Sequence, residues 1–167
     1  MNGYLEVFRA LNAARVRYVV VGGVAVVLQG HVRMTVDLDL VVDLAVEPAR
    51  AVLDLLAELG FRPRLPVDPH DFADPAIRDR WVAERNLQVF SLHHPDDPLS
   101  EIDLFATHPL PFEHLLAEAD EMQVGSVRVP VASIPHLLHL KRAAGRPRDL
   151  EDIEALSRLQ QERDGPS

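Results

Sequence analysis

The sequence predicts a domain of the α/β (α+β) class, with a mixed central sheet flanked by helices and a pair of helices at the C-terminal end. Three observations lead to this class. Short runs rich in β-branched residues interleave with stretches whose apolar residues recur at helical spacing. Glycine and proline separate most of these runs, and 167 residues suffice for one domain with a substantial core.

The composition excludes several kinds of site. The chain has no cysteine, so disulfides, thiolate nucleophiles and cysteine-ligated zinc are absent, and any metal must be held by oxygen or imidazole. The formal net charge of −9 argues against an extended nucleic-acid surface, because lysine and arginine supply most of the affinity for phosphate backbones. No apolar run approaches the roughly 20 residues of a membrane helix, and the N-terminus lacks the features of a secretory signal. We therefore expect a cytoplasmic protein without membrane contact.

The first part of the chain is predicted to alternate between helix and strand. Apolar side chains recur at helical spacing in residues 4–15, which predicts an amphipathic helix. Residues 18–21 form a β-branched and aromatic run that ends at two glycines, as expected of a buried strand, and residues 24–29 follow as a short helix. Residues 35–42 are predicted to be the next strand.

A longer helix is predicted for residues 48–59. A proline in its first turn and a glycine directly after it suit the two ends of a helix. Residues 61–65 are expected to be a short strand. Residues 66–80 are rich in proline and aspartate and are expected to form a loop, with a helix near residues 75–84.

The second half is predicted to add strands to the sheet. Residues 87–93 and 101–105 resemble strands, and the sequence HPDDPLS between them predicts a turn. Residues 112–119 are predicted to be helical, and residues 123–131 are predicted to be extended.

Two helices, residues 134–144 and 150–160, are predicted to end the chain, divided by a glycine and a proline. We expect residues 1–167 to be a single domain. About residues 1–132 would contain the sheet with its helices and most of the candidate site, and the helical pair at 133–162 would complete that site.

Two acidic residues stand out in RMTVDLDLVV, residues 33–42, where Asp37 and Asp39 interrupt an apolar strand. Residues two apart in a strand project to the same face with Cα atoms roughly 6.5 to 7 Å apart. Two carboxylates held this way repel each other and need a counter-charge. A pair of magnesium ions about 3.5 to 4 Å apart is such a counter-charge in enzymes that transfer phosphoryl or nucleotidyl groups. An edge strand with one solvent-facing polar side is the alternative for an isolated Asp-x-Asp pair.

Two further features favour a phosphate and metal site. Gly22 and Gly23 lie between a strand and a helix, where backbone N–H groups approach a phosphate closely and the helix dipole favours negative charge. A plain turn also accounts for these glycines. Asp103, in SEIDLF, is a third carboxylate that could ligate the metal and take the proton of an attacking hydroxyl. A sheet-edge aspartate is the alternative for Asp103.

Taken together, these residues resemble the nucleotidyltransferase fold of the DNA polymerase beta superfamily. The resemblance lies in residues 18–42 and one later acid, namely Gly22, Gly23, Arg33, Thr35, Asp37, Asp39 and Asp103. It implies that the glycine motif, with Arg33 and Thr35 beside it, binds the phosphates of a nucleoside triphosphate. It also implies that the three acids hold two Mg²⁺ ions. The chain has Gly-Gly where many members of the superfamily have Gly-Ser.

A second stretch, LKRAAGRPRDLEDIEAL at residues 140–156, is similar to a motif of the small bacterial nucleotidyltransferases of the abortive-infection type. This resemblance implies that Lys141 reaches the triphosphate and acts in catalysis, assisted by Arg146 or Arg148. Asp149 and Asp152 would belong to the helix that closes the site. A lysine suits phosphate as a point charge and arginine suits it as a bidentate donor. Acids in a first helical turn that complement the helix dipole are the alternative for Asp149 and Asp152.

The resemblance implies a magnesium-dependent nucleotidyltransferase that moves a nucleoside monophosphate from a nucleoside triphosphate such as ATP to an acceptor hydroxyl and releases pyrophosphate. The acceptor would be a tRNA end, a protein or a small molecule. The branch of the superfamily also implies a toxin–antitoxin or phage-defence system, with a cognate antitoxin or toxin as partner. The alternative is an antitoxin-like or regulatory partner protein that binds nucleotide with little or no turnover.

Overall fold

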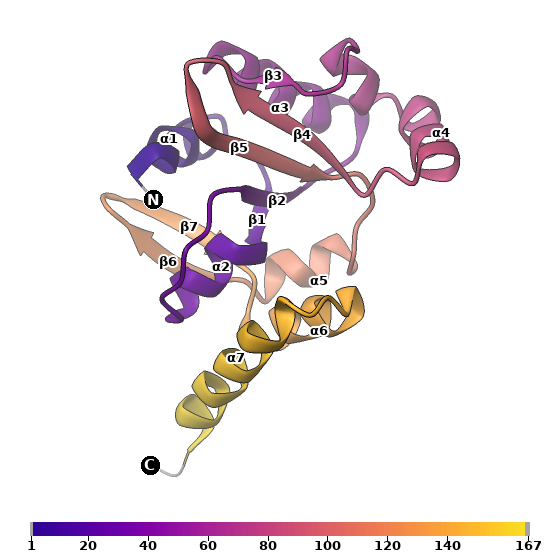
Figure 1. The fold of residues 1–167 in the computed structure, drawn as a ribbon. Helices are drawn as coiled ribbons and strands as arrows, with labels where there is room; N and C mark the ends of the chain where they lie inside the picture. Colours follow the sequence, from indigo (N-terminus) through magenta and orange to yellow (C-terminus); the bar gives the residue numbers. More distant parts are fainter. Residues whose placement is uncertain (1, 166–167) are drawn as a thin grey trace.

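The computed structural model describes residues 2–165, which form one seven-stranded sheet with helices around it (Figure 1). The strand order is β3-β4-β5-β2-β1-β7-β6. The strands are β1 (Tyr18–Val21), β2 (Leu38–Val42), β3 (Arg62–Pro63), β4 (Val89–His94), β5 (Asp97–Phe105), β6 (Asp120–Val124) and β7 (Val127–Val131). The predicted α/β class with a mixed central sheet is confirmed.

The sheet contains both parallel and antiparallel pairs. β1 lies between β2, to which it is antiparallel, and β7, to which it is parallel. β2 pairs with β5 in parallel, and this pair brings together two segments about sixty residues apart in the chain. The remaining pairs, β3 with β4, β4 with β5 and β6 with β7, are antiparallel.

The helices lie on two sides of the sheet. The α-helices are α1 (Leu5–Ala13), α2 (Gly22–Gln29), α3 (Val46–Glu58), α4 (Pro75–Arg85), α5 (Phe112–Ala117), α6 (Ile134–Ala144) and α7 (Asp149–Asp164), and two 3-10 helices are η1 (Asn2–Tyr4) and η2 (Pro69–Ala73). α1 packs against α3, whereas α2 packs against α6 and α7. In Figure 1, α3 and α4 lie beside the β4–β5 hairpin, and α6 and α7 lie at the opposite end of the molecule.

Along β4 and β5, buried side chains alternate with partly exposed ones, which distinguishes the two faces of this part of the sheet. Ile102 and Leu104 of β5 are fully buried, and Phe90 of β4 stacks on Phe72 of η2 with ring centroids 4.8 Å apart. The residues between them, which include Ser91 and Asp103, face the other side and are partly exposed. One face therefore belongs to the core, and the other carries polar side chains.

Two elements have both predicted ends, and the ends of the others differ by a few residues. The strand at 18–21 and the helix at 134–144 have the predicted ends. α2 begins at Gly22 rather than residue 24, and β5 begins at Asp97 rather than residue 101 because the turn between β4 and β5 is tighter than expected. The segment predicted to be extended at 123–131 belongs to the β6–β7 hairpin.

A further error concerns β2, which begins at Leu38 and not at residue 35. The ladder stops there because the hydroxyl of Tyr4 bonds to the backbones of Val36 and Glu101, which would otherwise approach each other. Asp37 thus lies outside the strand, and the expectation that it shares a regular strand face with Asp39 is wrong. Among the helices of residues 2–165, none has the length and apolar character needed to cross a membrane.

Candidate functional site

Three aspartates gather where β2 begins. Asp39 lies directly opposite Asp103 in the parallel pairing of β2 with β5, and Asp37 precedes β2. On the next strand, Ser91 faces Asp103 and its hydroxyl donates a hydrogen bond to Oδ1 of that aspartate at 2.5 Å. The fold therefore places the three acids predicted from the sequence around the same end of β2.

The electrostatics of Asp39 are those of a carboxylate without a counter-ion. Burial raises its pKa to about 7, and the neighbouring charges of Asp103 and Asp37 contribute to the rise. The cations of Lys141 and Arg146 act in the opposite direction but do not compensate. The side chain of Asp39 has no hydrogen bond or ion pair with any residue in the described range 2–165. A cation at this position would supply the missing charge.

Asp37 and Asp103 have raised pKa values for the same reasons. Burial is the main cause for both, and Glu101 raises both further by its charge. Arg64 acts against this rise, and it forms an ion pair with Glu101 in which Nε lies 2.9 Å from Oε2. Ser91, Glu101 and Arg64 were not predicted from the sequence. Glu101 could have been found from its position two residues before Asp103, on the same strand face.

Gly22 and Gly23 pack against the acidic segment. Gly22 has φ +67°, and a Cβ atom there would lie 2.0 Å from Oδ2 of Asp39. A Cβ atom on Gly23 would lie 2.4 Å from Oγ1 of Thr35 and 2.8 Å from Nη2 of Arg33. The first turn of α2 thus touches the segment that contains the Arg33, Thr35 and Asp39 side chains, and glycine is required for this contact. The predicted role of the two glycines in binding phosphate stays a prediction.

A buried network of ion pairs joins α6, α7 and the segment before β2. Lys141 Nζ lies 3.0 Å from Oδ1 of Asp149 and 2.8 Å from Oδ2 of Asp152. Arg33 Nε lies 2.8 Å from Oδ1 of Asp152, and Arg146 Nε lies 2.8 Å from Oδ2 of Asp149. The two aspartates are 1% and 2% exposed, so their charges depend on these cations. The two motifs found in the sequence therefore meet in space.

Arg148 differs from the other predicted cations. It is exposed, and it has no hydrogen bond or ion pair through its side chain within the described part of the chain. Its charge lowers the pKa of Asp37, which places it within electrostatic reach of the acids. Arg148 is thus free for an anion at the site, whereas Lys141 and Arg146 already have carboxylate partners.

The donor set suits a hard cation that brings other ligands with it. Carboxylate oxygens are the side-chain ligands that magnesium prefers, and it commonly takes the rest from phosphates and water. Asp37, Asp39 and the second oxygen of Asp103 are available. Within residues 2–165, no group of three or more Asp, Glu, His or Cys side chains is arranged to hold a metal ion. The carboxylates therefore suit a hard cation such as magnesium by their chemistry, with its remaining ligands supplied by another molecule.

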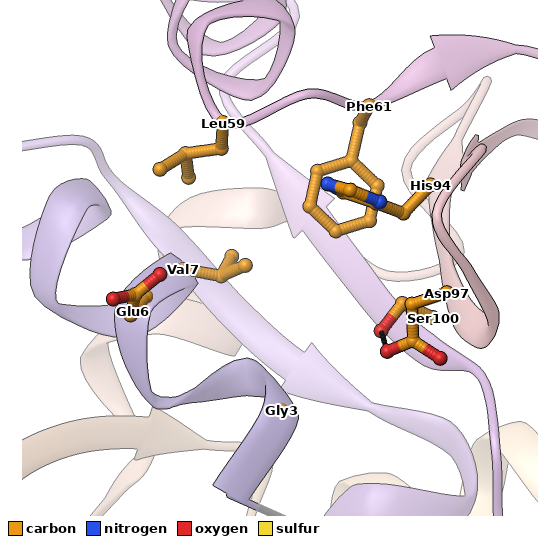
Figure 2. Close-up of a pocket in the computed structure, with 8 residues that line it drawn as sticks. All are labelled: Gly3, Glu6, Val7, Leu59, Phe61, His94, Asp97 and Ser100. Carbon is orange, nitrogen blue, oxygen red and sulfur yellow. Dashed lines mark hydrogen bonds between the residues drawn. The ribbon is translucent and has the colours of Figure 1, made fainter.

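A separate cavity of about 200 Å³ lies near the start of the chain (Figure 2). Glu6, Phe61, His94 and Asp97 are among the residues that line it. The rings of Phe61 and His94 meet edge to face, with centroids 5.4 Å apart. None of the site residues predicted from the sequence lines this cavity, so it is distinct from the aspartate cluster.

Comparison with solved structures finds proteins of similar fold. A lincosamide antibiotic adenylyltransferase, LnuA, bound to lincomycin superposes with a TM-score of 0.64 and 15% identity over 95% of this chain and 96% of that one. ANT(2")-Ia in complex with adenylyl-2"-tobramycin superposes with a TM-score of 0.59 and 16% identity, over 98% of this chain and 88% of that one. An antigenic nucleotidyltransferase-like protein from Paracoccidioides brasiliensis superposes with a TM-score of 0.58 and 18% identity, over 93% of this chain and 73% of that one.

These comparisons show that the chain has the nucleotidyltransferase fold. No protein-family model matches the sequence, and no curated protein matches it. The coarse expectation from the resemblance is therefore confirmed at the level of the fold. The abortive-infection branch is not tested by the comparisons.

Proposed function

We propose that the protein is a magnesium-dependent nucleotidyltransferase that transfers a nucleoside monophosphate, with ATP as the expected donor, to an acceptor hydroxyl. The observation that carries this proposal is the opposition of Asp39 and Asp103 on neighbouring parallel strands, with Asp37 beside them and no ion-pair partner for the Asp39 carboxylate in residues 2–165. Within a nucleotidyltransferase fold, the chemistry that needs such an acidic cluster is group transfer from a metal-bound triphosphate.

Each side chain has a defined task in the proposed reaction. Bound Mg²⁺ would neutralise charge on the phosphates, and Asp37, Asp39 and Asp103 would hold it. Asp103 would accept the proton of the acceptor hydroxyl while the hydroxyl oxygen bonds to the α-phosphorus and the bond to the β-phosphate oxygen breaks. The hydrogen bond from Ser91 uses one of the roughly four lone pairs of the Asp103 carboxylate, so others are left for Mg²⁺ and for this proton. Arg148 would stabilise the departing pyrophosphate.

The helical pair and the glycines would complete the site. We propose that residues 133–162 belong to the same domain as the sheet, since Arg33 and Asp152 join the two parts directly. Lys141 would reach the triphosphate after exchanging one of its carboxylate partners. The N–H groups at Gly22 and Gly23, with Thr35 beside them, would bind phosphate oxygens.

A small molecule is the acceptor class that the comparisons favour. The structure of LnuA contains lincomycin, and that of ANT(2")-Ia contains adenylyl-2"-tobramycin. The net charge of −9 also disfavours a long RNA surface. A tRNA or protein acceptor, and a toxin–antitoxin or phage-defence setting, remain part of the proposal because of the motif at residues 140–156.

A second candidate is a regulatory or antitoxin-like protein that binds nucleotide with little turnover. The observation that favours it is the pairing of Lys141 and Arg146 with Asp149 and Asp152, since these cations are then satisfied without a phosphate. In this candidate the site would bind a nucleotide and stop there.

One assay separates the two candidates. Each α-labelled nucleoside triphosphate is incubated with Mg²⁺, the protein and one of three acceptor pools: aminoglycosides and lincosamides, tRNA, or cellular protein. We expect label transfer to one pool and a loss of at least about 100-fold in Asp39→Asn and Asp103→Asn. Asp54→Asn, an exposed acid on α3, should transfer like wild type. Nucleotide binding without any labelled acceptor would support the second candidate instead.

A further inference from the structure

The hydroxyl of Tyr4 joins two segments that flank the acidic cluster. Its ring is buried, with 6% exposed, and its single proton faces the carbonyl oxygens of Val36 and of Glu101, the latter at 3.0 Å. The same hydroxyl accepts a hydrogen bond from the backbone N–H of Glu101 at 3.2 Å. The oxygen atom of Tyr4 thus links two backbone segments that lie 32 and 97 positions from Tyr4 in the chain.

This oxygen lies where the β2–β5 ladder would otherwise continue. At the N-terminal end of β2, the ladder ends with two residue pairs, Asp39 with Asp103 and then Leu38 with Ile102. One further step would place Asp37 opposite Glu101, but that pair is absent. In a regular parallel ladder, an N–H of one strand bonds directly to a carbonyl of the other. Here the Tyr4 hydroxyl occupies the place between the Val36 carbonyl and the Glu101 N–H.

The position of Asp37 follows from the hydroxyl of Tyr4 lying between the two strands. Val36, which bonds to Tyr4, directly precedes Asp37, and Glu101 lies two residues before Asp103. Without the hydroxyl, the two strands could pair one step further, and Asp37 would become an ordinary strand residue. With it, Asp37 leaves the strand at a fixed point while Asp39 and Asp103 remain paired.

We propose that Tyr4 is a positioning residue, whose hydroxyl fixes Asp37 relative to Asp39 and Asp103 so that the three carboxylates can hold a divalent cation. This inference rests on the function proposed above. The segment that carries Tyr4 is itself packed on the β4–β5 hairpin, where Gly3 borders the cavity formed with Asp97 (Figure 2). The ring packs in the core independently of the hydroxyl, so Tyr4→Phe removes only the link between the strands.

The chain offers a matched control in its other tyrosine. Tyr18 is also buried, and its hydroxyl donates to Oδ1 of Asn12 at 2.9 Å. Tyr18 pairs with Val42 at the far end of β2, away from the acids. Tyr18→Phe therefore removes a buried hydroxyl of the same kind without touching the cluster.

The experiment measures Mn²⁺ binding in the presence of a non-hydrolysable ATP analogue, from the loss of the free-ion electron paramagnetic resonance signal. We expect Tyr4→Phe to bind Mn²⁺ about tenfold more weakly than wild type, whereas Tyr18→Phe binds as wild type does. In an Asp37→Asn background, Tyr4→Phe should have little further effect, because the hydroxyl acts through that carboxylate. Amide hydrogen exchange provides a second readout, and Glu101 should exchange faster in Tyr4→Phe alone.

The outcomes are distinct. If wild type binds Mn²⁺ and Tyr4→Phe binds it equally well, the role given to Tyr4 is wrong while the proposed function stands. If Tyr4→Phe weakens binding equally with and without Asp37→Asn, the hydroxyl does not act through Asp37, and the inference also fails. If wild type binds no Mn²⁺ with the analogue, the proposed function fails and the role of Tyr4 fails with it.

Discussion

Both the backbone conformation and the close packing against Asp39 require glycine at position 22. Its φ of +67° is unfavourable for any residue with a Cβ atom, and that atom would lie 2.0 Å from the carboxylate of Asp39. The backbone strain alone costs about 1 to 2 kcal/mol. Gly22→Ala should therefore lower the free energy of unfolding by more than this amount and should displace Asp39. Urea unfolding measures the first effect, and Mn²⁺ binding with an ATP analogue measures the second.

Gly125 is the matched control for this substitution. It has φ +57° in the turn between β6 and β7, and a Cβ atom there would make only ordinary contacts with Leu5 at 3.4 Å. Gly125→Ala should carry the backbone strain but leave metal binding unchanged. Equal losses of stability and intact Mn²⁺ binding in both variants would contradict the contact between Gly22 and Asp39.

Asp149 should make stability depend on pH. Its burial would raise its pKa, but hydrogen bonds from Arg146 and Lys141 outweigh burial and lower the pKa below the usual value. A carboxyl whose pKa is lower in the folded state stabilises the fold above its unfolded pKa of about 3.9. That contribution is lost as the pH falls through the folded pKa.

Asp149→Asn tests this dependence. At pH 7 the variant should lose about 3 kcal/mol of unfolding free energy, because Lys141 and Arg146 lose a buried charged partner. The difference from wild type should shrink as the pH falls below the unfolded pKa of about 3.9, and it should be lost below the lowered folded pKa, where the carboxyl is protonated in both states. Urea titrations from pH 7 to about pH 2 measure it. A difference that is constant across this range would exclude the ionised carboxylate as its source.

At the scale of elements, the segment 31–37 has an unusual structure. Its backbone belongs to no strand, and the exposure of its side chains alternates. Arg33 and Thr35 are partly buried, whereas Val32 and Met34 are 90% and 91% exposed. Its amides should exchange hydrogen much faster than those of β1 in the free protein, since β1 is central in the sheet.

The same exchange experiment should respond to ligand. Binding of Mg²⁺ with an ATP analogue at Asp37 and Asp39 should slow exchange in segment 31–37 and leave β1 unchanged. Mass spectrometry of peptic fragments measures both regions in one experiment. Slow exchange of segment 31–37 in the free protein would contradict the unpaired backbone seen here.

Elements with local signatures could be predicted, and those that depend on distant contacts could not. The end of α6 was predicted from the glycine that follows its last residue, and Ser133, which caps its first turn, is a second local signal present in the sequence. The predicted start of β2 was wrong because the hydroxyl of Tyr4, at which the β2–β5 pairing ends, lies 32 residues from Val36 in the chain. The type of element was thus easier to predict than its ends.

The candidate site divides in the same way. Asp37, Asp39 and Asp103 were chosen for their chemistry, and the fold places them together. The partner of Arg33, Asp152, lies 119 residues away, and no local pattern connects the two. Ser91 could not be chosen either, because its contact with Asp103 depends on the register of β4 against β5. Register and ion pairing between distant segments required the structure.

For the whole molecule, charge sets an expectation about partners. With a net charge of −9, the protein should bind a tRNA pool more weakly than about 10⁻⁴ M at physiological salt. Fluorescence anisotropy with labelled tRNA measures this affinity. Micromolar binding whose logarithm falls steeply with the logarithm of salt concentration would indicate several phosphate contacts and would favour a tRNA acceptor over a small molecule.

The two edges of the sheet have consequences for self-association. β3 is two residues long and contains Pro63, which has no N–H to donate, and the other edge, β6, carries Asp120 and Glu121. Short, proline-containing or charged edges resist pairing with a second sheet. Segment 31–37 has no such protection, since its backbone pairs with no strand and its outer side chains Val32 and Met34 are apolar. Aggregation of concentrated, nucleotide-free protein should therefore begin at this segment, and Met34→Lys should delay it.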